Sequence, residues 1–446
     1  MKNSNYTPKY YINSSNALES ISEHQIGDGM SIVVDNNESK GNIVDRKTGK
    51  RYIDFFTCFA SMPLGYNHPK MLESNFLDYI GMHSLNKPSN SDLYSEVQAT
   101  FTKTLFKIAV PKDDFKYSFY IEGGALAVEN ALKAAMDWKV RKNIKKGLSE
   151  TIGTKVLHFK QAFHGRTGYT LSITNTDPVK VMYFPKFDWP RVDNPKIIFP
   201  IENNLDDIMK REKESIRQIE KAFIDNKDDI CSIIIEPIQG EGGDNHFRDE
   251  FFVELRRICD ENNALLIFDE VQTGVGMTGK MWAYQHLSIK PDIICFGKKM
   301  QVCGILSNTR IDEVEDNVFH KSSRINSTWG GNYTDMVRIT KYLEIIEEEN
   351  LVDNSDKMGN YLHSLLQKLQ NENSDIISNV RGKGLFRAFD IQQELRKPLL
   401  DRCFENGLIV LACGNNSVRF RTRLNITESE LDEGISLISK TISQIR

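Results

Sequence analysis

Two charged pairs follow two short apolar runs in the middle of the chain. An Asp-Glu pair at 269–270 comes directly after the run 265–268, and a Lys-Lys pair at 298–299 comes shortly after the run 293–296. Fully apolar runs of this length are typical of strands that are buried on both faces of a parallel sheet. Because ligands gather at the carboxyl ends of such strands, we expect an acid and an amine to face one site.

An acid and an amine in one site have a specific chemical use. A lysine amine can form a Schiff base with an aldehyde, and a buried carboxylate can keep a pyridine nitrogen protonated, so that the ring withdraws electrons. Asp269 and Lys298 are 29 positions apart, which leaves room for a strand, a crossover and a neighbouring strand. Taken alone, a strand-end acid that caps a turn and two solvated lysines explain the same residues.

Two further segments have the side chains that such a site needs. Gly124 and Ala125 lie between a strand predicted at 116–121 and an alanine-rich helix, where free N–H groups and the helix dipole attract a phosphate. Phe163 follows the next predicted strand and can stack on a planar ring, while Arg166 can bind a carboxylate through two hydrogen bonds. The plain alternatives are a tight glycine turn in the first segment, and a core phenylalanine with a surface arginine in the second.

The elements that must position these residues alternate along the chain. Strand and helix patterns follow one another over residues 65–335, which predicts a large α/β domain with a mainly parallel central sheet and helices on both faces. Residues 1–64 are expected to form an N-terminal arm and hairpin, part of a smaller domain whose C-terminal α+β portion spans 336–446. Within that portion, one strand is expected at 408–411, and a capping signature at Thr427 predicts the start of the last helix.

Composition excludes several classes of protein. The chain has 446 residues, of which 40% are hydrophobic, and its net charge of −4 gives no reason to expect nucleic acid or a membrane surface as a partner. Its seven cysteines are scattered without a CxxC pair, which favours reduced thiols in the cytoplasm over disulfides or a metal site. The amino terminus lacks an apolar signal segment, and no run of about 18 apolar residues occurs, so we expect neither a signal peptide nor a membrane span.

A larger set of motifs stands in a fixed order along the chain. It consists of Gly124-Ala125-Leu126-Ala127-Val128-Glu129 with Lys133, the segment from Phe163 to Arg166, Glu236-Pro237-Ile238-Gln239-Gly240-Glu241-Gly242, Asp269-Glu270-Val271-Gln272-Thr273-Gly274, Pro291-Asp292, and Gly297-Lys298. In this order the chain resembles the class III aminotransferases, a fold type I family that depends on pyridoxal 5′-phosphate. The resemblance runs over most of the chain. Within the class, the segments 86–92, 122–133, 296–299 and 326–332 look like the lysine ε-aminotransferase subgroup.

The resemblance implies roles for residues around the cofactor. Lys298, rather than Lys299, is expected to be the Schiff-base lysine, and we expect only one of the two to reach the ring, since neighbours in an extended segment point to opposite sides. Asp269 is expected to pair with the pyridine nitrogen. The other implied contacts are Gln272 near the ring oxygen, Phe163 stacked on the ring, the backbone amides of Gly124 and Ala125 on the phosphate, His164 and Glu236 among the cofactor-binding residues, and Thr328 on the phosphate of the partner subunit. The last contact implies a homodimer with shared active sites.

Substrate choice is implied by three charged residues. Arg166 is expected to bind the α-carboxylate of L-lysine, which leaves the ε-amine free to react. Arg419 is expected to bind the carboxylate next to the reacting carbon of 2-oxoglutarate or glutamate, and Glu241 to pair with Arg419 during the lysine half-reaction and then move aside. Arg421 and Arg423 add two more cations nearby. The implied reaction is a ping-pong transfer of the ε-amino group from L-lysine to 2-oxoglutarate, which gives 2-aminoadipate 6-semialdehyde and L-glutamate.

Three alternatives stay open at this point. The same chemistry can act on another ω-amine, such as ornithine, 4-aminobutyrate or a diamine. A catalytically silent protein can keep the cofactor site. An aminomutase or racemase can use the same fold without a keto acid.

Overall fold

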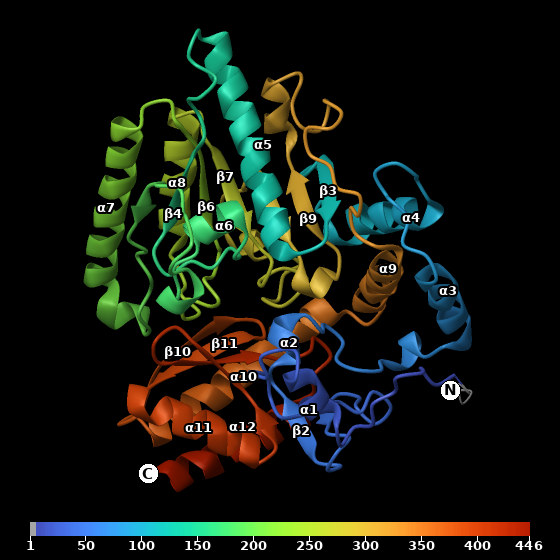
Figure 1. Ribbon diagram of the computed structural model, residues 1–446. Helices are drawn as coiled ribbons and strands as arrows, with labels where there is room; N and C mark the ends of the chain where they lie inside the picture. The colour runs from blue at the N-terminus through green and yellow to red at the C-terminus, as the bar shows by residue number, and fades with distance from the viewer. Residues whose placement is uncertain (1–5) are drawn as a thin grey trace.

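A seven-stranded sheet forms the centre of the larger part of the molecule in the computed structural model, which describes residues 6–446 (Figure 1). The strand order is β3-β9-β8-β7-β6-β4-β5, and all pairs from β8 to β5 are parallel, which confirms the mainly parallel sheet. The first five residues of the predicted N-terminal arm lie outside the described residues. The strands are β3 (Tyr117–Ile121), β4 (Lys155–Phe159), β5 (Arg191–Val192), β6 (Ile230–Ile235), β7 (Leu265–Asp269), β8 (Ile293–Phe296) and β9 (Cys303–Ser307).

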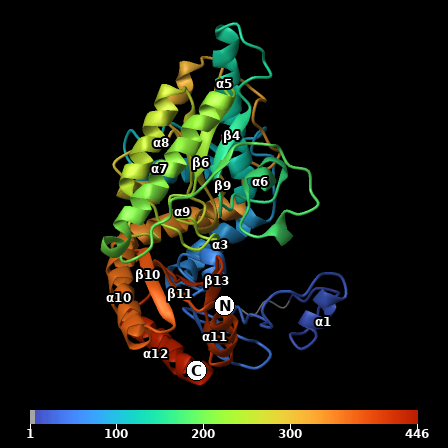
Figure 2. The ribbon, with the colours of Figure 1, turned by 90° about the vertical axis from the view of Figure 1, so that its left-hand side faces the viewer.

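Helices cover both faces of this sheet (Figure 2). Its side chains alternate between the two helical layers, which is why its inner strands are apolar throughout. Leu265 and Ile267 of β7 belong to a buried cluster with α5, whereas Leu266 and Phe268 belong to a cluster with α8 on the opposite face. Helix α6 packs beside α5, and α7 packs beside α8. These helices are α5 (Gly124–Lys145), α6 (Gly168–Ile173), α7 (Ile201–Asp225) and α8 (Asp249–Glu261).

Two strands of the sheet were absent from the prediction, the two-residue edge strand β5 and the longer strand β9. Strand β9 runs antiparallel to both of its neighbours, with Leu306 opposite Ile294 of β8 and Ile305 opposite Phe119 of β3. Because β9 returns directly alongside β8, the Lys-Lys pair lies at the bend between these two strands. The apolar run in β9 is too short for periodicity to separate a strand from a buried turn.

Two smaller sheets form the lower part of the molecule in Figure 1. Four strands pair antiparallel in the order β10-β11-β14-β13, and three more have the order β1-β2-β12. The single strand predicted at 408–411 is wrong, because β12 pairs with β2 while β13 pairs with β14, and Val410 lies between them. A buried segment that changes sheets keeps an unbroken apolar pattern, so the sequence shows one run. The strands are β1 (Ile43–Val44), β2 (Arg51–Asp54), β10 (Ile377–Lys383), β11 (Phe386–Ile391), β12 (Leu408–Ile409), β13 (Leu411–Cys413) and β14 (Ser417–Arg421).

Four C-terminal helices complete this part of the molecule. The capped start predicted at Thr427 is confirmed, since the Thr427 N–H donates to the Glu430 carboxylate at 3.0 Å and the Glu430 N–H donates to the Thr427 hydroxyl. Such a cap contributes about 1 kcal/mol to stability. The helices are α9 (Tyr333–Glu348), α10 (Leu351–Glu372), α11 (Gln393–Glu405) and α12 (Glu428–Ile445).

Helices α3 and α4 both pack on α9, and α2 packs on β14, so these N-terminal helices lie against the C-terminal half of the chain. Within residues 6–446, no helix combines the length and the apolar character needed to cross a membrane. The remaining elements are α1 (Ala17–Ser22), α2 (Thr57–Ala60), α3 (Ser74–Ser84) and α4 (Glu96–Thr104), with short turns η1 (Pro69–Met71), η2 (Leu105–Ala109), η3 (Pro178–Lys180), η4 (Ala283–His286), η5 (Lys298–Met300) and η6 (Thr309–Glu313).

Candidate active site

A cavity of about 310 Å³ lies where the carboxyl ends of β7 and β8 meet the N-terminus of α5. It brings together all the predicted site residues except Arg419 and Thr328. The lining residues are Gly124, Ala125, Phe163, His164, Gly165, Arg166, Glu236, Glu241, Asp269, Val271, Gln272 and Lys298.

The acid at the end of β7 points into this cavity, and its neighbour in the chain does not. The alternation of the strand turns Asp269 toward the α5 layer, where its Oδ2 lies 2.8 Å from Nδ1 of His164. Glu270 points to the opposite side, and its carboxylate accepts the N–H groups of Ala283 and Tyr284. Burial raises the pKa of Glu270 to about 7. Asp269 is therefore the acid that faces the cavity, and Glu270 holds the following loop.

The two lysines after β8 also point to different places, although not for the predicted reason. Lys298–Met300 form a 3-10 turn rather than an extended segment, and Lys298 has a φ of +47°, which costs a non-glycine residue about 1–3 kcal/mol. Lys298 lines the cavity, whereas the amine of Lys299 donates to the carbonyl of Gln272 at 2.6 Å. Burial, and then the charge of Arg419, lower the pKa of Lys298 to about 8. This amine is therefore more readily neutral than an exposed lysine.

The N-terminus of α5 leaves N–H groups available at the other end of the cavity. Its cap residue is Gly123, which has a φ of +104° and cannot offer a side-chain hydrogen bond to the helix. The helix has 22 residues, and its dipole adds partial positive charge at Gly124 and Ala125. A Cβ on Gly165 would lie 2.4 Å from the Cβ of Ala125, so the loop can approach the helix this closely only with glycine. This end of the cavity fits a phosphate.

Glu236 connects two loops of the cavity wall. Its carboxylate accepts the N–H of Phe163 at 2.9 Å and the N–H of Gly240 at 3.0 Å. Burial raises the pKa of Glu236 to about 7, although nearby His164 opposes that shift. Glu236 thus positions the loop that presents Phe163, and direct contact of either residue with a cofactor stays a prediction.

Three charged residues lie between the cavity and the four-stranded sheet, and Glu241 is the one that lines the cavity. Arg419 lies on β14, and its Nη2 donates to Oε2 of Glu241 at 2.8 Å. Lys180, for which no role was predicted, donates to Oε1 of the same carboxylate at 2.6 Å. Burial favours the neutral acid, but Arg419 and Lys180 outweigh burial and keep the pKa of Glu241 below its usual range. Arg166 is exposed, and it forms no hydrogen bond or ion pair with another residue of 6–446.

A buried ion pair orients Gln272. Arg421 and Asp244 are both almost fully buried, and Nη1 of Arg421 lies 2.9 Å from the Asp244 carboxylate. Arg421 also donates to Oε1 of Gln272 from Nε at 3.1 Å and from Nη2 at 2.9 Å. Because the amide oxygen of Gln272 is occupied, its NH2 group is the part left for a ligand. The sequence showed Arg421 only as an additional cation, since a pair 177 positions apart has no local signal.

Thr328 does not line the cavity of its own chain; it is exposed on the loop between η6 and α9.

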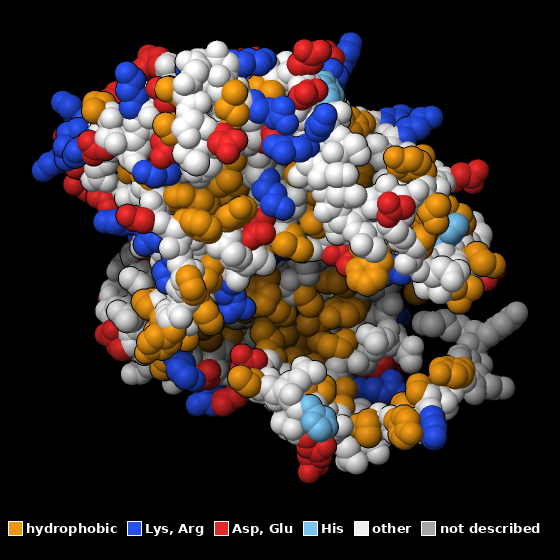
Figure 3. Space-filling view, turned by 45° about the horizontal axis from the view of Figure 1, so that its top comes forward, with side chains coloured by type: hydrophobic (Ala, Val, Ile, Leu, Met, Phe, Trp, Pro, Cys, Tyr) orange, Lys and Arg blue, Asp and Glu red, His pale blue; other side chains and the backbone are white. Residues whose placement is uncertain are grey.

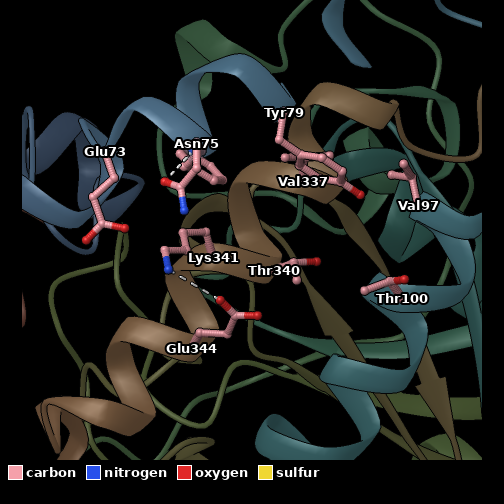
Figure 4. A pocket seen from close by; sticks show the side chains of 10 residues that line it. Glu73, Asn75, Tyr79, Val97, Thr100, Val337, Thr340, Lys341 and Glu344 are labelled. Carbon is pink, nitrogen blue, oxygen red and sulfur yellow. Dashed lines mark hydrogen bonds and ion pairs between the residues drawn. The ribbon is translucent and has the colours of Figure 1, made fainter. Parts of the chain in front are cut away.

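A second cavity, of about 410 Å³, lies between α3, α4 and α9 (Figure 4). Two of its charged residues, Lys341 and Glu344, form an ion pair at 3.6 Å, and the predicted site residues lie elsewhere. Of these two cavities, the first therefore holds the side chains that could take part in a reaction.

The first cavity fits pyridoxal phosphate by the chemistry of its groups. The amine of Lys298 faces it with no hydrogen bond to another residue of the described part of the chain. Asp269 offers a buried carboxylate for a pyridine nitrogen, and α5 offers free amides for a phosphate. These residues would hold the cofactor by three separate contacts.

Comparison with known proteins agrees with a cavity for pyridoxal phosphate. Residues 26–442 match the family model described as aminotransferase class-III. The L-lysine-epsilon aminotransferase of Mycobacterium tuberculosis is 46% identical over 429 residues, which cover 95% of this chain and 94% of that protein. The protein of the same name from Streptomyces clavuligerus is 43% identical and is matched over 96% of this chain and 94% of its own. A solved structure of lysine aminotransferase from M. tuberculosis has a TM-score of 0.95 at 45% identity and covers 98% of this chain and 100% of its own. The chain therefore belongs to the class-III aminotransferases, a family of pyridoxal-phosphate-dependent enzymes.

Proposed function

We propose that this protein is an L-lysine 6-aminotransferase. It moves the ε-amino group of L-lysine to 2-oxoglutarate, and it forms 2-aminoadipate 6-semialdehyde and L-glutamate in two half-reactions. Support comes from the names of the relatives that match nearly the full chain. It also comes from the charges on the substrate side of the cavity.

The contact between Glu241 and Arg419 is the observation that carries this proposal. L-Lysine must present a carbon with no carboxylate beside it, whereas 2-oxoglutarate must present a carbon that has one. An arginine without a partner at this place attracts the α-carboxylate of lysine and brings the wrong amine to the reacting position. Glu241 neutralises Arg419 while lysine is bound and leaves it when 2-oxoglutarate binds. Arg166 receives the carboxylate at the far end of either substrate.

The residues at the other end of the cavity act on the reacting carbon. Bound pyridoxal phosphate supplies an aldehyde for the amine and a ring that withdraws electrons. Lys298 removes a proton from the carbon that bears the reacting nitrogen, and its lowered pKa near 8 suits this exchange. Asp269 keeps the pyridine nitrogen charged, and His164 orients the Asp269 carboxylate. Gln272 offers its NH2 group to the ring oxygen.

A homodimer with shared active sites is part of the same proposal. Large apolar side chains are exposed on and after α3, at Tyr79, Met82, Leu85, Leu93 and Tyr94. Hydrophobic side chains also gather around a hollow on the face shown in Figure 3. Exposed apolar groups in such number are typical of a surface that another chain covers.

The loop that carries Thr328 is continuous with this apolar segment. Asn90 donates to the carbonyl of Gly331 at 2.8 Å, and the amine of Lys87 lies 4.3 Å from the ring centre of Trp329. A partner that covers the segment also contacts the loop, which supports Thr328 as a phosphate ligand for the partner's site. The oligomeric state is measured by light scattering.

Two coarser expectations also stay proposals. A cytoplasmic location is supported by the seven cysteines, all of which are free thiols. The division between the large domain and the C-terminal part near residue 335 is supported by the four-stranded sheet β10-β11-β14-β13, all of whose strands follow that residue. Helix α9 joins the two parts, since it packs on α3 and α4 as well as on α10.

A panel of amino donors tests the proposed function. The purified holoenzyme receives 2-oxoglutarate with L-lysine, L-ornithine, 4-aminobutyrate or a diamine, and mass spectrometry identifies the products. We expect the highest kcat/KM with L-lysine and the transfer of ¹⁵N to glutamate from ε-labelled lysine but not from α-labelled lysine. A better rate with another donor, or transfer of the α label, would refute the proposal. Turnover without a keto acid would instead indicate a mutase or racemase.

A further inference from the structure

Each oxygen of the Glu241 carboxylate has its own cation. Oε2 accepts from Arg419 at 2.8 Å, and Oε1 accepts from the amine of Lys180 at 2.6 Å. The Arg419 side chain is 3% exposed, whereas those of Lys180 and Glu241 are both 27% exposed. Glu241 is therefore held from two sides, once from the buried sheet and once from the more open cavity wall.

Lys180 lies beside the cavity rather than on a remote surface, because its amine contacts two of the lining residues. It ends the short turn η3, whose first residues are fixed by the Asp177 side chain, which accepts the N–H of Val179 at 3.0 Å. Its amine lies 5.6 Å from the ring centre of Phe163, one of the cavity-lining residues. The position of this amine follows from a turn that the chain itself stabilises.

Arg419 still has donors for a second carboxylate while Glu241 is in place. Its Nε and Nη1 are buried and have no hydrogen-bond partner among the described residues. A substrate carboxylate that accepts a hydrogen bond from Nη2 of Arg419 must first displace Glu241 from that atom. Glu241 must then also break its contact with Lys180, unless the Lys180 side chain moves with it.

We propose that Lys180 is a positioning residue that holds Glu241 on Arg419, and so sets the balance between the amino donor and the dicarboxylate acceptor. This inference rests on the proposed exchange at Arg419. Lys180 favours the state in which Arg419 is neutralised, the state that suits L-lysine. It opposes the state in which Arg419 is free for a dicarboxylate.

The expected effect is modest, because both partners of the ion pair are partly exposed. Removing such a pair changes an equilibrium by roughly two- to fivefold. With Lys180→Met, we expect the KM for 2-oxoglutarate and the dissociation constant for glutarate to fall by that factor. Glutarate serves as a dicarboxylate that lacks the reacting carbonyl. The KM for L-lysine should stay the same or rise, because Arg419 is neutralised less often.

Matched variants separate this role from a general structural one. Lys180→Arg keeps the cation and should restore the wild-type KM values. In a Glu241→Gln background the Lys180→Met change should have no further effect on either constant, because the charge that it holds is already absent. Calorimetry with glutarate and steady-state kinetics on the five holoenzymes, which are the wild type, the three single variants and the double variant, give the required constants.

Three results would overturn the role of Lys180. Unchanged constants in Lys180→Met would show that the ion pair has no influence, and a rise in both constants would show that Lys180 binds the acceptor directly. A full effect in the Glu241→Gln background would show that Lys180 acts through another residue. Failure of the proposed function is a separate result, since wild-type enzyme would then fail to use L-lysine before any variant is made.

Discussion

The two ends of the cavity are built in different ways. The cofactor end consists of Gly124, Ala125, His164, Asp269 and Lys298, and the substrate end consists of Arg166, Lys180, Glu241 and Arg419. The first is held by strand ends and a helix terminus of one sheet, and Asp269 and His164 are buried there. The second joins loops of that sheet to β14 of another sheet, and Arg166, Lys180 and Glu241 are at least partly exposed.

This difference follows from what each end must do. Contacts with one cofactor stay the same through both half-reactions, so a rigid and preorganised setting favours them. The substrate end meets molecules with different charges in turn, so a pair such as Glu241 and Arg419 must open and close. The Arg419 side chain is buried but that of Glu241 is partly exposed. Glu241 can therefore leave toward solvent at a smaller free-energy cost than an acid in a fully buried pair.

Among the changes at either end of the cavity, replacing Lys298 by Ala should reduce the reaction rate the most. Both half-reactions should slow by at least about a thousandfold, because the variant loses its nucleophile and its proton carrier. Reduction of the wild-type holoenzyme with borohydride, followed by peptide mass spectrometry, should locate the cofactor on Lys298. A cofactor found on Lys299 would contradict the assignment.

Replacing Asp269 by Asn should weaken both half-reactions to a similar extent. The change removes a charge but keeps an oxygen that can face His164, and the lost charge should cost roughly 100-fold in rate. Single-turnover absorbance changes measured separately with L-lysine and with 2-oxoglutarate give the two rates. A loss confined to one substrate would show that Asp269 does not act through the ring.

Replacing Arg419 by Gln should instead separate the two half-reactions. The KM for 2-oxoglutarate should rise by roughly 30-fold or more, because a charged contact to its carboxylate is lost, while lysine should be affected far less. Arg166→Gln is the matched control, since its guanidinium should serve both substrates. Equal losses with both substrates in Arg419→Gln would remove the distinction between the two ends.

The pH dependence of cofactor capture should give the smallest effect. Burial lowers the pKa of Lys298 to about 8, so its neutral, nucleophilic form increases as the pH rises to that value and then levels off. Capture of pyridoxal phosphate by the apoenzyme should accelerate by up to about tenfold per pH unit below pH 8. Stopped-flow absorbance measures the rate. A rise that continues to pH 10 would indicate an unperturbed lysine.

The cofactor end was the more predictable of the two. Asp269 and Lys298 follow apolar strands, and the glycines before α5 lie at a strand-to-helix junction, so each has a signal among its immediate neighbours. The reason given for expecting only one of Lys298 and Lys299 to reach the ring was nevertheless wrong, because the backbone turns there instead of extending. The antiparallel strand β9, which follows that bend, was not seen in the pattern, because Gly304 interrupts its apolar residues.

The sequence by itself determined the α/β order, the strand ends that carry the acid and the amine, and the family motifs, because these depend on residues close together in the chain. Only the tertiary structure decided that Lys180 reaches Glu241 and that Arg421 orients Gln272. It also decided the left-handed turn of α2, which places Phe59 at 5.7 Å from the guanidinium of Arg419. Such contacts depend on how separate sheets and loops pack, and no local pattern of side chains records that packing.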